Sequence, residues 1–126
     1  MRVFKTKSFG RFQRKERIAD AALCEAVRRA ERGLVDADLG HGLIKQRVAR
    51  PGEGRRGGFR TVIAYRVSDR AVLLFGFAKS DQANLSQDDE RDLKDYGALL
   101  LALDAGGIGK MLAAKELTEV DYGEQA

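Results

Sequence analysis

Three basic residues on two predicted strands have the types and spacing of a phosphate-binding cluster. Residues 43–49 and 59–67 are rich in branched and aromatic residues, which is typical of strands. Side chains two apart on a strand share a face, so Lys45 and Arg47 are expected to point the same way. Arg60 opens the second strand, and antiparallel pairing would bring it toward the other two cations at one end of the sheet.

A sheet face with several cations suits the phosphate backbone of RNA, because Lys and Arg bind phosphate and Arg can also stack on a base. Such a site can also cut RNA, since the 2′-hydroxyl is an internal nucleophile. Arginines can stabilise the charged phosphorane, and a lysine crowded by other cations is a candidate for proton transfer. The competing interpretation is a set of ordinary solvated strand residues, because a sheet with one open face commonly alternates in this way.

Further cations are expected to surround this cluster. Lys79 ends a third predicted strand, residues 71–78, which a hairpin through residues 68–70 would return toward Arg60. The connection at residues 50–58 contains four glycines and the only proline, which predicts an exposed, mobile loop. Its basic residues would form the rim of the cluster: Arg50, Arg55 and Arg56.

The remaining reactive residue types give weaker indications. The only histidine, His41, lies between two glycines; it is a candidate acid, base or RNA contact, or a plain loop residue. The only cysteine, Cys24, lies in a helical pattern and is interpreted as a small buried hydrophobe. No Cys/His cluster has metal-ligand spacing, and the glycines of residues 52–58 match no nucleotide-binding loop. We therefore expect neither a metal nor a cofactor.

The flanking elements must position these strands. Residues 2–9 alternate like a strand, and residues 11–32 show one alanine-rich apolar stripe at helical spacing, with arginines off the stripe. Gly33 fits a helix C-terminal cap. A second helix is predicted from an N-cap at Ser86 to about Asp104, followed by a glycine break, a short helix at residues 110–117 and a last strand residue, Val120.

This order predicts a single α+β domain over residues 1–126. Its core would be a small antiparallel sheet of about four strands, with the N-terminal and C-terminal helices packed on one face and the other face open.

The charge of the chain is divided unevenly along its length. Residues 1–66 carry 17 Lys and Arg against 7 Asp and Glu, a net of +10, and residues 67–126 carry 6 against 12, a net of −6. The basic half can steer polyanions to one face, or the two halves can neutralise each other across the fold. The amino terminus is too short and charged for a secretory signal, and no apolar run reaches the length of a membrane span. We expect a cytoplasmic protein with no membrane partner.

The stretch from Leu39 to Ser86 resembles the RelE/ParE superfamily of bacterial toxins, and within it the HigB-like branch. The resemblance continues into the leucine-rich helix and the tail, and its most specific parts are LIKQRVARPG, GGFRTVIAY and FGFAKSDQANLS. It implies a four-stranded antiparallel sheet with helices on one face. It also implies a ribosome-dependent mRNA endonuclease, or mRNA interferase, that a co-transcribed antitoxin holds inactive.

The resemblance also implies catalytic residues. Lys45 and Arg47 match two basic residues on a central strand of RelE-like members, and Arg60 matches the arginine that opens the next strand. Lys79 matches the basic residue after the following strand, where arginine is usual. A tyrosine that stacks on the substrate base is common a few residues later, and here that position falls at Leu85. HigB-like members often have histidines near the site, and this chain offers only His41.

Three functions remain open on the sequence. The first is a translation-inhibiting RNA endonuclease whose partners are a cognate antitoxin, the ribosome and mRNA, with operator DNA bound through the antitoxin. The second is a ParE-like inhibitor of DNA gyrase. The third is a nucleic-acid-binding co-repressor without catalysis. Fold cannot separate the first two, and the basic strand cluster favours the endonuclease.

Overall fold

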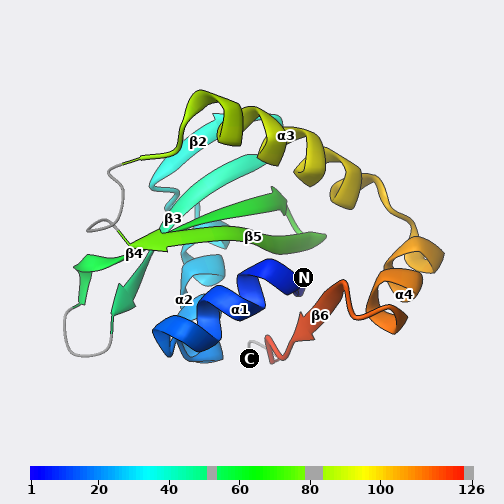
Figure 1. The fold of residues 1–126 in the computed structure, drawn as a ribbon, viewed down its shortest axis with the longest axis horizontal. Helices are drawn as coiled ribbons and strands as arrows, with labels where there is room; N and C mark the ends of the chain where they lie inside the picture. Colours follow the sequence, from blue (N-terminus) through cyan, green and yellow to red (C-terminus); the bar gives the residue numbers. More distant parts are fainter. Residues whose placement is uncertain (51–53, 79–83, 124–126) are drawn as a thin grey trace.

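A central sheet organises the fold, and its strand order differs from the order along the chain (Figure 1). The computed structural model describes residues 1–50, 54–78 and 84–123, with residues 54–57 described by their backbone alone. The six strands lie in the order β2-β3-β4-β5-β1-β6. The elements along the chain are β1 (Arg2–Thr6), α1 (Lys7–Glu16), α2 (Asp20–Glu31), β2 (Ala37–Gly40), β3 (Leu43–Arg50), β4 (Gly54–Arg66), β5 (Arg70–Ala78), α3 (Gln87–Ala102), α4 (Ala105–Ala113) and β6 (Leu117–Val120). The predicted α+β class is confirmed, with six strands in place of about four.

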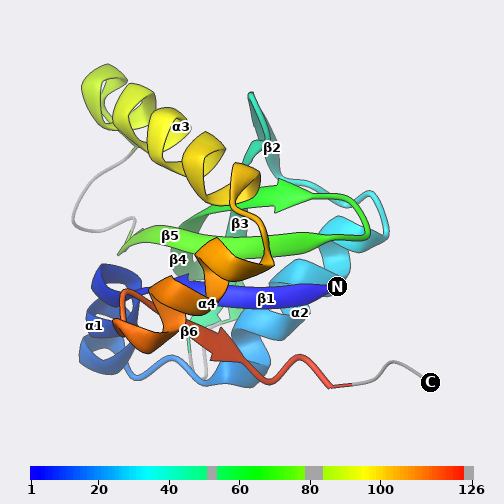
Figure 2. The ribbon, with the colours of Figure 1, turned by 90° about the vertical axis from the view of Figure 1, so that its right-hand side faces the viewer.

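The predicted meander forms the centre of the sheet. β3 pairs antiparallel with β4, and β4 pairs antiparallel with β5. β1 then lies parallel to β5 on its other side, and β6 pairs antiparallel with β1. Strands from both ends of the chain therefore close one side of the sheet, where β1 and β6 lie next to each other (Figure 2).

Helices cover both faces of the sheet, so the prediction that they pack on one face is wrong. On the back face, α1 and α2 bury one core cluster with Ile44 and Ile63 of the strands. On the front face, α3 and α4 bury a second cluster with Leu43 and Val62. Successive strand residues point to opposite faces of a sheet. Around Leu43, Ile44, Val62 and Ile63 the residues on both faces are apolar, which allows a helical layer on each side.

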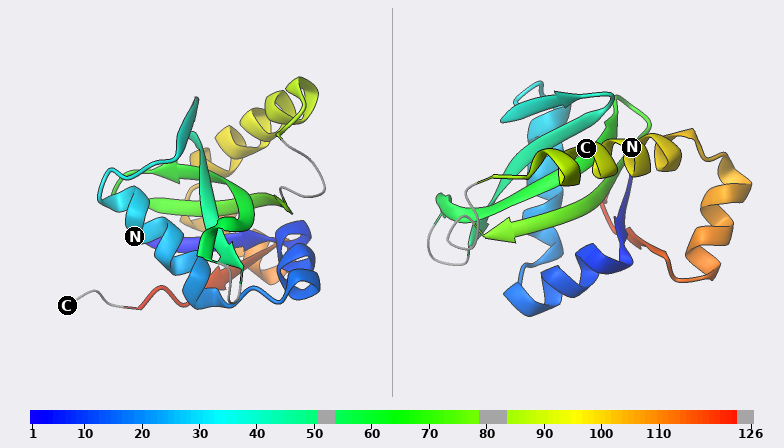
Figure 3. Two further views of the ribbon diagram at one scale, coloured as in Figure 1. Left: turned by 90° about the vertical axis from the view of Figure 1, so that its left-hand side faces the viewer. Right: turned by 45° about the horizontal axis from the view of Figure 1, so that its top comes forward.

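α3 packs closely against the strands but covers only part of the front face. A Cβ on Gly97 would meet side-chain carbons of Ala64, Leu74 and Leu43 at 3.3–3.5 Å, so glycine lets the helix approach the strands closely. Figure 3 shows α3 crossing the strands, with the ends of β4 and β5 extending beyond it. The front face near the start of β4 is consequently not covered by α3.

The N-terminal helical pattern forms two helices instead of one. Thr6 caps α1 by accepting a hydrogen bond from the backbone N–H of Phe9 at 3.1 Å, so the first strand stops earlier than predicted. α1 ends at Glu16, its C-cap residue Arg17 has a left-handed φ of 57°, and α2 begins at Asp20. Periodicity alone did not reveal this corner. Gly33, with a φ of 80°, follows α2 as predicted.

Other boundaries also differ from the prediction. β4 begins at Gly54, which pairs with Arg50 of β3. Residues 54–58, which were predicted to belong to a mobile loop, are therefore part of a β-hairpin. β2 forms at Ala37–Gly40, between the predicted helix and the predicted strand at residues 43–49, where no strand was expected. α4 begins at Ala105 because the Asp104 carboxylate caps it at 2.7 Å from the N–H of Gly107, so the glycines predicted to break the chain are helical.

Among the described helices no single one is long and apolar enough to cross a membrane; α3 and α4 pass such a test only as a pair, bent by 114°.

Candidate functional site

Strand register places the three predicted cations together on the front face. Arg47 of β3 lies directly opposite Arg60 of β4, and Lys45 lies opposite Val62 in the neighbouring row. Directly opposed residues share a face, so Lys45, Arg47 and Arg60 form one group, named here the cationic cluster. The sequence prediction that these three residues converge is confirmed by this register.

The backbone around Arg47 brings the two arginine side chains close together. The Arg47 N–H donates to Asp36 Oδ2 at 2.7 Å, and the Arg29 guanidinium donates to the Arg47 carbonyl oxygen. Both backbone groups of Arg47 therefore point away from β4. Such a non-hydrogen-bonded pair has Cα atoms only about 4.5 Å apart, the closer of the two antiparallel arrangements.

No carboxylate neutralises the cationic cluster among the residues that the structure describes. Lys45 Nζ instead donates to the neutral amide oxygen of Asn84 at 3.0 Å, just before α3. Arg60 Nη1 is buried and has no hydrogen-bond partner within the described residues. Like charges directly opposite each other destabilise a strand pair by a few tenths of a kcal/mol to about 1 kcal/mol. An anion bound between the two arginines would remove this repulsion and satisfy the buried donor.

A buried polar network supports the cluster from the back face. Gln46 is fully buried and donates to the carbonyl oxygens of Ala26 at 2.9 Å and Leu34 at 3.1 Å. Its own side-chain oxygen accepts the N–H of Asp36 at 2.7 Å. The Thr61 hydroxyl, also fully buried, donates to the Gln46 carbonyl oxygen at 2.9 Å. The strands that present the cations are thus held in register by satisfied hydrogen bonds.

Arg29 completes this support and corrects a prediction. Sequence periodicity placed it off the apolar stripe of its helix, but its side chain is only 5% exposed. It pairs with Glu25 at 2.6 Å and with Asp36 at 3.3 Å. Because Asp36 also accepts the Arg47 N–H, this ion pair fixes the backbone of a cluster residue. The sequence signal was faint, since Glu25 precedes Arg29 by one helical turn.

Two aromatic rings on β5 share the front face with the cluster, and sequence reasoning gave them no role. Phe77 pairs with Arg60, and Phe75 pairs with Val62 beside Lys45. Their ring centroids are 6.0 Å apart. Phe75 is partly exposed, whereas Phe77 is 4% exposed. Leu85, where the resemblance expected a stacking tyrosine, packs against the front core. The alternation Phe-Gly-Phe was the signal that could have identified this pair.

The structure does not bring every candidate residue to the cluster. The Arg50 guanidinium lies 4.8 Å from the centroid of the Phe59 ring. Phe59 belongs to the back-face core, so Arg50 does not join the cluster on the front face. His41 is exposed in the tight turn between β2 and β3, with a left-handed φ of 57°, at the end of β3 away from Arg47.

Three predicted residues are not placed. Lys79 lies outside the described residues, and so do the side chains of Arg55 and Arg56, whose backbone belongs to β4.

Cys24 is buried as predicted, at 4% exposure, and its thiol donates to the Asp121 carbonyl oxygen at 3.6 Å. Burial raises the pKa of this thiol, which keeps it protonated and unreactive. Within the described ranges, no three His, Cys, Asp or Glu residues gather where they could hold a metal ion.

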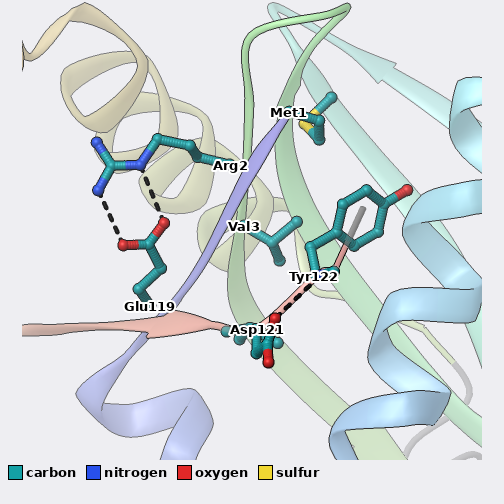
Figure 4. A pocket seen from close by; sticks show the side chains of 8 residues that line it. Met1, Arg2, Val3, Glu119, Asp121 and Tyr122 are labelled. Carbon is teal, nitrogen blue, oxygen red and sulfur yellow. Dashed lines mark hydrogen bonds and ion pairs between the residues drawn. The ribbon is translucent and has the colours of Figure 1, made fainter. Parts of the chain in front are cut away.

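A pocket of about 440 Å³ lies away from the cluster, at β1 and β6 (Figure 4). Arg2 and Glu119 form one wall through an ion pair of 2.8 Å, which holds the pKa of the Glu119 carboxyl below its usual value. Tyr122 forms another wall; burial and its hydrogen bond to Glu31 raise the pKa of its phenol. The one basic side chain of the pocket lining, Arg2, is thus neutralised, in contrast to the cations of the cluster on β3 and β4.

Comparison with known proteins identifies the family. A family model described as the RelE toxin of the RelE/RelB toxin–antitoxin system matches residues 1–120. The chain belongs to the RelE toxin family. No curated protein matches the chain. The family match covers the whole cationic cluster and all strands of the sheet. As a RelE-family toxin, the chain is one component of a toxin–antitoxin system, and an antitoxin is its partner.

Proposed function

We propose that this RelE-family toxin is a metal-independent RNA endonuclease that cleaves mRNA at the ribosome in the cytoplasm and is neutralised by its antitoxin. The observation that carries the proposal is the pair of opposed, unneutralised arginines, Arg47 and Arg60. Two adjacent cations cost stability in the free protein, and a phosphodiester between them would be the natural counter-charge.

The proposed reaction uses the substrate's own nucleophile. The 2′-hydroxyl oxygen attacks the adjacent phosphorus, the bond from phosphorus to the 5′ oxygen breaks, and a cyclic phosphate and a new 5′-hydroxyl result. Arg60 stabilises the doubly charged phosphorane. Lys45 and Arg47 position the RNA and assist transfer of the proton from the 2′-hydroxyl to the leaving oxygen. Lys79 adds positive charge near that oxygen, and Arg55 and Arg56 contact the flanking backbone.

Phe75 supplies an aromatic surface for a base in this proposal. It is partly exposed beside Lys45, and its row adjoins the row of the two arginines. A base stacked on an aromatic ring is typically stabilised by about 1–3 kcal/mol. This contact would take the place of the aromatic that is absent at Leu85, and it favours a single-stranded, unstacked substrate.

The test compares Arg60→Ala with Arg66→Ala in bacterial cells that express the toxin without antitoxin. Both arginines belong to β4, but Arg66 lies at the far end and pairs with Asp69 at 3.1 Å. Loss of one phosphate-stabilising donor typically lowers the rate of such a step by roughly a hundredfold or more, so Arg60→Ala should permit growth and Arg66→Ala should not.

Primer extension on cellular mRNA after induction identifies the activity. New breaks within codons, present for the wild type and Arg66→Ala and absent for Arg60→Ala, support the endonuclease. Growth arrest with intact mRNA and inhibited DNA gyrase points to a ParE-like inhibitor instead. Salt-dependent RNA binding without any cleavage on ribosomes points to a co-repressor.

A further inference from the structure

A second group of cations lies on α1, outside the cationic cluster. The exposed side of this helix presents four basic residues, named here the α1 stripe: Lys7, Arg11, Arg14 and Lys15. At 100° per residue these positions share one side of the helix, opposite the buried residues Phe9 and Gln13. The stripe is therefore a continuous basic surface along the helix.

The α1 stripe has no counter-charges of its own. Within the described part of the chain, none of its four residues forms an ion pair. The only acidic residue of α1, Glu16, is partly buried on the other side of the helix. Some other exposed cations are paired with a neighbouring carboxylate, as Arg91 is with Asp88 at 3.0 Å and Arg66 with Asp69 at 3.1 Å. Arg32 and Lys110 form no ion pair among the described residues, but each stands as a single exposed cation at its helix. Four like charges along one helix side repel one another, and a polyanion would relieve the repulsion.

We infer that the α1 stripe is a docking surface for the phosphate backbone of a structured RNA, separate from the cationic cluster. This inference rests on the proposed function, because it names a second contact that the same RNA target would make. The 1.5 Å rise per helical residue places Lys7 and Arg11 about 6 Å apart along the axis, which is comparable with the spacing of neighbouring phosphates. Contacts of this kind position an RNA without reading its sequence.

The composition of the stripe favours RNA over a protein partner. Its exposed residues are basic, with Ser8 beside them, and no apolar side chain interrupts them. Protein interfaces are depleted in charged residues at their centres and enriched in aromatic ones. The exposed apolar side chains of helices lie elsewhere, on α3, where Leu99 is 55% and Tyr96 is 38% exposed. The stripe thus lacks the apolar centre that an antitoxin interface would need.

The position of α1 implies an RNA target larger than a short single strand. Phe12 of α1 packs edge-on against Phe59 at 5.5 Å, on the back face, whereas the cationic cluster lies on the front face. Figures 1 and 2 show α1 on the side of the sheet away from α3. A helix with its side chains is about 10 Å across, so a short strand bound at the cluster would not cover the stripe. A folded RNA such as ribosomal RNA can contact both surfaces.

The test removes the stripe with Lys7→Gln, Arg11→Gln, Arg14→Gln and Lys15→Gln combined. A matched control removes four exposed cations from other elements with the same loss of charge: Arg32→Gln, Arg66→Gln, Arg91→Gln and Lys110→Gln. Two probes are bound to each protein, purified small ribosomal subunits and a short single-stranded RNA whose 2′-O-methyl groups block cleavage. Circular dichroism checks that both variants keep the wild-type fold.

The stripe variant should lose binding to the ribosomal subunits and should still bind the short RNA as the wild type does. Four phosphate contacts contribute about 3.6 to the slope of log K against log salt, which is on the order of a hundredfold between about 50 and 200 mM. The variant should lack this part of the salt dependence, and the control should keep it. Subunit binding equal to the control overturns the inference, and so does an equal loss on both probes, which would mean that only total charge matters.

Two further outcomes also decide against the inference. If the stripe variant binds subunits normally but no longer binds the antitoxin, the occupant is a protein. If the wild type does not bind the ribosomal subunits, α1 does not dock a structured RNA. The proposed function is judged separately by the cleavage assay with Arg60→Ala, so the docking surface can fail while the endonuclease stands.

Discussion

The two faces of the β3–β4 pair differ in whether their polar side chains have partners. On the back face, Gln46 and Thr61 are fully buried, and their side chains form hydrogen bonds with backbone groups. On the front face, one residue away in sequence, Arg47 and Arg60 oppose each other without a carboxylate among the described residues. Satisfied polar groups build the scaffold, whereas unsatisfied charge held on that scaffold marks the surface available to a ligand.

The largest loss of stability is expected for Arg29→Met, on the back face. Its buried guanidinium pairs with Glu25 and Asp36 and donates to the Arg47 carbonyl oxygen, and its removal breaks both ion pairs and this hydrogen bond. Breaking such a buried pair costs about 3 kcal/mol, at the lower end of the usual range because both carboxylates keep some contact with water. Urea unfolding measures this change. A loss below 1 kcal/mol would mean that Arg29 does not support β3.

Gln46→Leu should have the next largest effect. It removes three side-chain hydrogen bonds, so the Leu34 carbonyl oxygen and the Asp36 N–H lose their Gln46 partner, while the Ala26 carbonyl oxygen keeps its bond within α2. Buried unsatisfied groups give an expected loss of about 2–3 kcal/mol. RNA cleavage per folded molecule should change far less than for Arg60→Ala. If Gln46→Leu abolishes cleavage at full stability, the division between scaffold and ligand surface is wrong.

Thr61→Val is the milder change in the same network. The substitution keeps the branched shape and removes only the hydroxyl that donates to the Gln46 carbonyl oxygen at 2.9 Å. The expected loss is about 1 kcal/mol, the net contribution of one hydrogen bond. Comparison with Gln46→Leu in the same denaturant series tests the order of the two effects.

These two faces also show what the sequence could predict. Alternation placed Lys45 and Arg47 together because side chains two apart on a strand necessarily share a face, and the meander followed from short links. The fate of Arg29 could not be read in this way. Its partners come from its own helix and from the loop before β2, so only the folded chain shows that it is buried.

Local signals failed where a distant contact decided the structure. Gly106, Gly107 and Gly109 predicted a break, but the Asp104 cap and the burial of Ile108 place them in α4. Arg50 follows the register shift at the end of β3, so counting residues along the loop did not place its side chain over Phe59. The strands β2 and β6 are short because each depends on pairing with one neighbour, a contact that no local pattern records.

On the front face, removal of a charge should leave stability unchanged or raise it. Arg47→Gln relieves the repulsion across the Arg47–Arg60 pair, which predicts a gain of up to about 0.5 kcal/mol, while cleavage falls. Urea unfolding and the cleavage assay on the same preparation measure both quantities. This result would contrast directly with Gln46→Leu, one residue away. A loss of 1 kcal/mol or more would show that Arg47 belongs to the scaffold.

The smallest effect concerns acid stability at the corner between α1 and α2. The Gln13 amide donates to Asp20 Oδ1 at 2.7 Å and, with help from Lys5, holds the pKa of the Asp20 carboxyl below its usual value. A carboxyl with a lowered pKa stabilises the fold above its unfolded pKa of about 3.9 and loses that contribution as the pH falls further. Asp20→Asn should therefore be slightly less stable than the wild type at pH 7, and the two should converge as the pH falls through the lowered pKa of the folded-state Asp20 carboxyl. Asp20 is exposed, so the difference is small, and unfolding midpoints that stay equally far apart as the pH falls would show that the carboxylate does not stabilise this corner.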